Sequence, residues 1–132
     1  MASGFLGFGL PANSNLLGFN NQVTINSVAS GAVGFSFARF GPLVGVSATT
    51  SLASATPVTF AAGAFPPDYC PLDATRPVIT TLAGYANAGS VTSALQLTIN
   101  SDGSGSIDVS DPLAAAGTRT MPIGANATYT VM

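Results

Sequence analysis

The chain has 132 residues, and its only charged side chains are three arginines and five aspartates, with no histidine. A chain of this length builds one domain with one core, and 47% apolar residues exclude a disordered class. Three scattered arginines without lysine argue against a nucleic-acid partner. No apolar run reaches the length of about 18 residues that a membrane-spanning helix needs, so we expect no membrane partner either.

Charged side chains make up 6% of the residues, against about 25% in an average soluble domain. Two explanations are open at the level of composition. Assembly with partners could cover much of the surface, because the centres of protein interfaces are poor in charge. Alternatively, serine, threonine and asparagine could solvate an ordinary monomer surface.

Residues 1–20 form a stretch of their own, in which glycine and asparagine interrupt the apolar side chains, so a stable helix is not expected. We interpret residues 1–20 as an extended N-terminal arm that contacts a partner, and residues 21–132 as the folded domain. The alternative is an edge strand that packs on its own domain. The expected anchors of the arm are Phe5, Leu6, Phe8, Leu10, Leu16, Leu17 and Phe19.

Short β-branched runs, separated by glycine, proline, asparagine and serine, follow along the chain. No window repeats apolar residues at helical spacing without such a break. The sequence therefore predicts an all-β fold, an antiparallel, jelly-roll-like β-sandwich behind the N-terminal arm. Strands are expected at residues 23–28, 31–37, 43–47, 57–60, 78–82, 91–99, 106–109, 118–123 and 127–131, with 37–46 also strand-like and 47–56 a surface loop or edge strand.

Two connections carry clear turn signals. Residues 65–77 hold four of the nine prolines, and proline cannot donate to a sheet ladder, so this segment is expected to be a loop over one end of the sandwich. Between the alternating runs 95–99 and 106–109, the pair Asp102-Gly103 tolerates the positive φ of a tight turn. These two runs are therefore predicted to form a hairpin.

The side chains for most enzyme chemistry are missing. Nucleophilic catalysis needs a base that titrates near neutral pH, and the chain has neither histidine nor lysine. Asp102, Asp108 and Asp111 are close in sequence, and a glycosidase pair or a calcium site is the alternative to turn chemistry for them. We predict no enzymatic activity and no catalytic residue, cofactor or metal. Cys70 is alone and cannot form an internal disulfide.

Two further groups of residues are candidates for contacts. Phe35 and Phe40, with the alanine-rich region 53–64, are expected to contribute to a trimer interface. Tyr69, Tyr85 and Asn87 are candidates for a carbohydrate-contacting tip, with residues 84–90 interpreted as a loop, because aromatic rings stack on sugar faces. Packing within the loops is the alternative explanation for these three residues.

Four motifs occur in a fixed order: Phe37, Arg39 and Gly41; then Phe65, Pro66, Tyr69 and Pro71; then Leu97, Thr98, Ile99, Asp102 and Gly103; and finally Tyr129, Thr130 and Val131. This order resembles the jelly-roll head and decoration domains of bacteriophage virion surface proteins, over the chain from about Val28 onward. Asp68 and Cys70 depart from the glycine and arginine that the family has in its second motif.

The resemblance implies a structural protein on the virion surface, made in the host cytoplasm and assembled as a homotrimer. Its partners would be the major capsid protein or another virion protein. With only about 20 residues before the first strand, we expect a capsid decoration or cement protein that docks on the shell through its arm and stabilises it. The alternative is the receptor-binding, glycan-binding head of a tail fibre.

Overall fold

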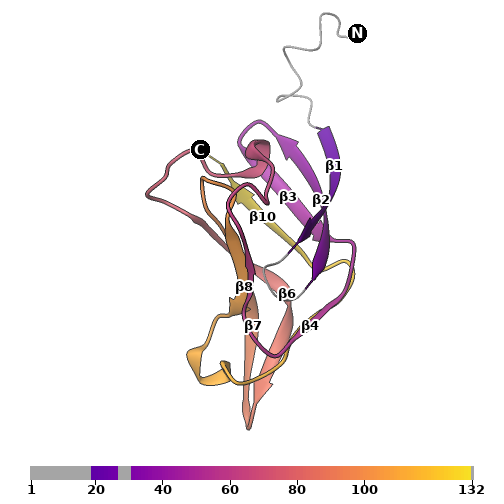
Figure 1. Ribbon diagram of the computed structural model, residues 1–132, viewed down its shortest axis with the longest axis vertical. Coiled ribbons are helices and arrows are strands. Elements are labelled where there is room, and N and C mark those ends of the chain that lie inside the picture. Colours follow the sequence, from indigo (N-terminus) through magenta and orange to yellow (C-terminus); the bar gives the residue numbers. More distant parts are fainter. Residues whose placement is uncertain (1–18, 27–30, 132) are drawn as a thin grey trace, which may run out of the picture.

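The computed structural model describes residues 19–26 and 31–131, which form two antiparallel sheets (Figure 1). The first sheet has the order β1 (Phe19–Asn26), β2 (Ala32–Phe40), β3 (Leu43–Ala48) and β10 (Asn126–Thr130). The second has the order β4 (Leu52–Ser54), β9 (Arg119–Met121), β6 (Val78–Ala88), β7 (Val91–Ile99), β8 (Gly105–Val109) and β5 (Val58–Phe60). The helical elements in the described residues are two short 3₁₀ turns, η2 (Pro67–Tyr69) and η3 (Pro112–Ala114).

The predicted all-β, jelly-roll-like sandwich is confirmed, and its core follows from the two-residue period of the strands. In β7, Leu95, Leu97 and Ile99 are fully buried and alternate with more exposed neighbours. Successive side chains of a strand point to opposite faces, so each sheet turns one apolar face inward. Those inner faces meet in one cluster of buried residues between the sheets.

Aromatic rings fill the core at one end of the sandwich. Phe35 and Phe37 from β2 pack against Phe60 and Phe65, with ring centroids 5.9–6.3 Å apart in the contacts across elements. Tyr69 stacks on Phe37 at 4.4 Å, and the two rings are nearly parallel. Phe65 and Tyr69 belong to the proline-rich segment 65–77, which forms no strand and covers this end of the core. The predicted loop over the sandwich end is therefore confirmed.

The predicted hairpin is confirmed as β7 and β8, which pair in register from Leu95 opposite Val109 to Ile99 opposite Gly105. Gly103 in the connecting turn has a φ of 84°. A Cβ there would lie 2.9 Å from the Gly63 nitrogen and from the Phe65 oxygen, so only glycine fits. The Asp102 carboxylate accepts hydrogen bonds from the Ser104 amide and hydroxyl, which fixes the turn.

Two expectations about the elements are corrected, and a third, the edge strand, is confirmed. Residues 37–46 are not one strand, because Gly41 adopts a φ of 54° and the chain reverses between β2 and β3. Residues 84–90 are not a loop, because β6 continues through a bulge to Ala88. Gly84 allows this bulge, since a Cβ there would lie 2.6 Å from the Thr120 oxygen. The segment 47–56 contains the edge strand β4.

Candidate functional site

Four large apolar side chains are exposed together at the end of the sandwich where β1 begins. They are Phe40, Leu43, Leu72 and Ile79, which are 59%, 50%, 77% and 60% exposed, and we call them the end surface. Phe40 lies directly opposite Leu43, and Leu43 lies opposite Thr130, so this part of the surface crosses three neighbouring strands. Clustered exposed apolar side chains are typical of an interaction site, whereas isolated ones are ordinary.

Backbone hydrogen bonds hold the end surface in a fixed shape. The Val131 amide donates to the Pro42 oxygen at 2.9 Å, and the Leu72 amide donates to the Val131 oxygen at 3.3 Å. The buried Tyr129 hydroxyl donates to the Tyr69 oxygen at 2.8 Å. These bonds join the β2–β3 turn, the C-terminal strand and the 65–77 loop, so the exposed side chains are carried by a rigid support.

A groove of about 360 Å³ lies between Ile79 and the end of β10. Pro71, Arg76 and Pro77 form its wall on the loop side, and Thr128 and Thr130 form the opposite wall. The Thr80 hydroxyl donates to the Thr128 oxygen at 3.2 Å, which closes the groove at its inner end. The groove therefore offers room beside Ile79, and the hydrogen bond between Thr80 and Thr128 joins β6 to β10.

Charges near the end surface balance one another. Arg39 donates to the Gly41 and Asp68 backbone oxygens, so its guanidinium is held against the protein. Arg76 lies 3.7 Å from Asp73 in an exposed ion pair. Both arginines are thus bound by the protein, Arg39 by backbone oxygens and Arg76 by Asp73. An apolar centre with a polar rim is the usual anatomy of a protein interface.

The expected arm anchors Phe5, Leu6, Phe8, Leu10, Leu16 and Leu17 lie outside the described residues. Phe19 and Asn20, which were assigned to the arm, lie in β1, where Phe19 pairs with Arg39. Because Arg39 precedes Phe40, the chain enters β1 beside the end surface (Figure 1). The start of β1 and Phe40 therefore lie at the same end of the sandwich.

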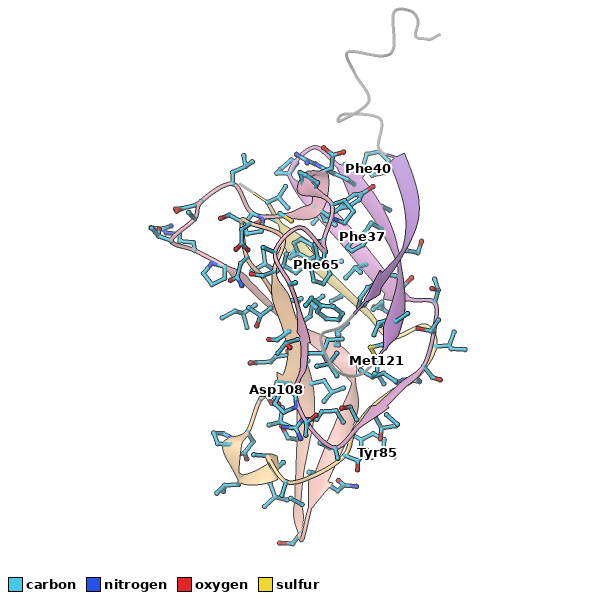
Figure 2. All side chains as sticks on the ribbon, in the orientation of Figure 1. Phe37, Phe40, Phe65, Tyr85, Asp108 and Met121 are labelled. Carbon is cyan, nitrogen blue, oxygen red and sulfur yellow. The ribbon has the colours of Figure 1, made fainter. Side chains whose placement is uncertain are left out.

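One of the two aromatic residues expected in a trimer interface is buried in the core instead. Phe35 is fully buried and packs on Phe37, Phe60 and Phe65, so it is a core residue and the expectation is wrong. Phe40, five residues further along β2, points outward at the end of the strand, as Figure 2 shows. Because side chains alternate along a strand, an odd separation puts the two rings on opposite faces of β2, and the face of Phe35 is the one that packs in the core between the sheets.

The three residues proposed for a carbohydrate-contacting tip do not form one site. Tyr69 is 1% exposed and stacks on Phe37, so its assignment to a tip is wrong. Tyr85 and Asn87 are exposed and lie two residues apart in β6, at the end opposite to Phe40 (Figure 2). The Asn87 carbonyl already accepts a hydrogen bond from the Thr92 hydroxyl. Of the two tyrosines proposed for the tip, only Tyr85 has a ring that is exposed to a ligand.

A buried arginine that sequence reasoning missed lies at this second end. Arg119 is 1% exposed, and its guanidinium donates twice to Asp108, at 3.1 and 2.7 Å. It also donates to the carbonyl oxygens of Ala55, Ala115 and Gly117. These bonds tie β8, β9 and two loops together. No local pattern in the sequence announces this role, because the partners come from distant segments.

Three aspartates that are close in sequence make different contacts. Asp102 fixes the β7–β8 turn, Asp111 accepts from the Leu113 amide at the start of η3, and Asp108 holds Arg119. Turn chemistry is thus confirmed for Asp102 and Asp111, while Asp108 lies in β8 and forms an ion pair. Within residues 19–26 and 31–131 no cluster of potential metal ligands occurs. Burial raises the pKa of the Cys70 thiol to about 11, which disfavours a reactive thiolate.

In the part of the chain that the structure describes, no helix is long and apolar enough to cross a membrane. Comparison with known proteins gives no relative, since neither a family model nor a curated protein matches this chain.

Proposed function

We propose that this chain is a structural protein of the virion surface, a bacteriophage capsid decoration protein that docks on the shell through its N-terminal arm and stabilises it. The single observation that supports this best is the end surface beside the entry into β1. An uncharged, apolar arm and an exposed apolar surface at one end suit attachment to another protein. The jelly-roll-like sandwich and the low charge of the chain fit the same role.

The decoration protein works as a homotrimer in this proposal, with the major capsid protein as its partner. A surface with a net charge of −2 and few charges in total offers little repulsion between copies. Light scattering on the dissociated protein tests this part, and a monomer at micromolar concentration would refute the trimer. That result would leave the attachment to the shell open to its own test.

Antibodies against the chain, applied to particles from its source and viewed by electron microscopy, test the location. Label over the shell is expected for a decoration protein. Label confined to the fibre tips would instead support the receptor-binding head, with Tyr85 at the exposed end as a contact. Absence of label from all particles would refute both virion functions.

The attachment device is tested in the full chain by the variant Phe5→Ser/Leu6→Ser/Phe8→Ser/Leu10→Ser. We expect this variant to fold like the natural chain and to lose particle binding in sedimentation. Burial of each such side chain contributes about 1.5–3 kcal/mol. If the arm were an edge strand packed on its own domain, the variant would lower the unfolding midpoint and leave the binding of the folded fraction unchanged.

A further inference from the structure

We propose that the end surface is the second half of the shell contact, so that the molecule stands on the shell on Phe40, Leu43, Leu72 and Ile79 with its Tyr85 end pointing outward. This inference rests on the proposed attachment to a shell and names the surface and the orientation involved. Its partner is an apolar, uncharged surface of a shell subunit.

Exposed apolar side chains are unevenly distributed over the domain, which favours the end surface as the contact site. Seven large apolar side chains are exposed in the described residues, and four of them form the end surface. The other three, Tyr85, Leu113 and Ile123, come from β6, from η3 and from the turn before β10. Register pairs Phe40 with Leu43, backbone hydrogen bonds join Leu72 through Val131 to Pro42, and Ile79 shares a groove with Thr130, whereas no such link joins the other three to one another. The end surface therefore contains the largest group among these seven exposed apolar side chains.

The charges near the end surface indicate the chemistry of the partner. Arg39 precedes Phe40 and binds backbone oxygens, and Arg76 in the 65–77 loop forms an ion pair with Asp73. A strongly acidic or basic partner would gain nothing from such a rim. An apolar protein surface can bury the four side chains and leave these charges in water at the margin. The binding strength should accordingly change little with salt.

The place where the chain enters β1 favours a shell subunit over a second copy of this chain as the partner. The 18 residues before Phe19 can extend to at most about 60 Å, and they enter the sandwich opposite Arg39, next to Phe40. A shell subunit that binds the arm is thus kept close to the end surface. Linkage of this kind gives a weak second contact a high effective concentration.

The groove beside Ile79 adds a feature that a partner side chain can use. Its walls come from the 65–77 loop and from β10, and the Thr80 hydroxyl closes its inner end. An apolar side chain of the shell would lie against Ile79 and Pro77 there. Arg76 and the threonines of the same groove supply polar groups at its margin.

The test compares two variants of the full chain with an intact arm. Phe40→Ser/Leu43→Ser alters the end surface, and Leu113→Ser/Ile123→Ser is the control, because its side chains are equally apolar and 74% and 69% exposed. Binding to particles stripped of the protein is measured at low and high salt. We expect the end-surface variant to bind about 100-fold more weakly, about tenfold for each side chain. The control should bind like the natural chain at both salt concentrations.

Other results would overturn the inference. Equal binding of both variants would show that the end surface faces away from the shell, although the proposed function would stand if the natural chain binds. If Phe40→Ser/Leu43→Ser instead dissociates the free protein in light scattering, the surface belongs to contacts between copies of this chain. If the natural chain itself fails to bind particles, the proposed function fails first. Circular dichroism confirms that each variant is folded.

Discussion

The two ends of the sandwich use side chains in opposite ways. At the end where the arm enters, Phe40, Leu43, Leu72 and Ile79 are exposed to solvent. At the other end, the charged Arg119 is buried and bound by Asp108 and three carbonyl oxygens. Exposed apolar side chains do not stabilise the isolated domain, whereas a buried, fully bonded arginine holds its elements together. The comparison teaches that one end is held together by a buried, paired charge, while the other leaves apolar side chains uncovered and is the end that we propose for contact.

The largest expected effect separates core from surface within β2. Phe35→Ala removes a fully buried ring and should lower the free energy of unfolding by about 4 kcal/mol. Phe40→Ala, in the same strand and 59% exposed, should change it by less than about 0.5 kcal/mol. Urea denaturation measures both variants. Similar losses in the two would mean that Phe40 is part of the core and that the end surface does not exist as described.

The second comparison is between two arginines. Arg119→Met leaves the carbonyls of Ala55, Ala115 and Gly117 without their donor, and we expect a loss of about 3 kcal/mol. Arg76→Met is the control, because its side chain is 86% exposed and its ion pair with Asp73 contributes little. Thermal unfolding of both variants measures the difference. A stable Arg119→Met protein would show that this end does not depend on the buried guanidinium.

A third comparison concerns two glycines with positive φ in hairpin turns. Gly103→Ala adds a methyl group against the backbone of Gly63 and Phe65 and should cost about 2 kcal/mol. Gly41→Ala, in the β2–β3 turn beside the end surface, meets nothing within 4 Å and should cost only the backbone strain of about 1 kcal/mol. Chemical denaturation of the two variants gives the order, and the reverse order would contradict the packing at Gly103.

The smallest effects are expected from pH. Hydrogen bonds from Thr75 and Ser104 lower the pKa values of Asp73 and Asp102 below their ordinary 3.8. Their contribution is present above that pH and is lost as the pH falls through the lower folded values. Burial, and then the charge of Asp102, raises the pKa of Cys70 from 9.0 to about 11. Its contribution is present below pH 9.0 and is lost as the pH rises toward 11.

Between these limits no side chain of the chain titrates at its ordinary pKa, because histidine is absent. Urea midpoints should therefore be constant from about pH 5 to pH 8 and should fall on the alkaline side. Cys70→Ala should make the alkaline decline shallower. A steep change in the midpoint near neutral pH would contradict this account of the titrating groups.

Local signals predicted much of the fold, and distant contacts decided the rest. The β7–β8 hairpin was predictable because alternation and Asp102-Gly103 are local features. Tyr69 was expected at an exposed tip, but its ring stacks on Phe37 of β2. Sequence spacing does not reveal a contact between a loop residue and a strand so far away in the chain. Arg119 was missed for the same reason, since its partners come from three segments, those of Ala55, of Asp108 and of Ala115 with Gly117. Phe40, expected in a trimer interface, is exposed, while Leu43, Leu72 and Ile79 had no local signal.

Hydrogen exchange on the full chain, free and bound to its particle, tests the difference between the two ends most directly. The account predicts slower exchange on binding for backbone amides around Phe40, Leu43, Leu72 and Ile79. It predicts unchanged exchange around Tyr85, at the opposite end, and around Leu113 in η3. Slower exchange around Tyr85 and Leu113, with no change around Phe40 and Leu43, would contradict the claim that the arm end is the contact end.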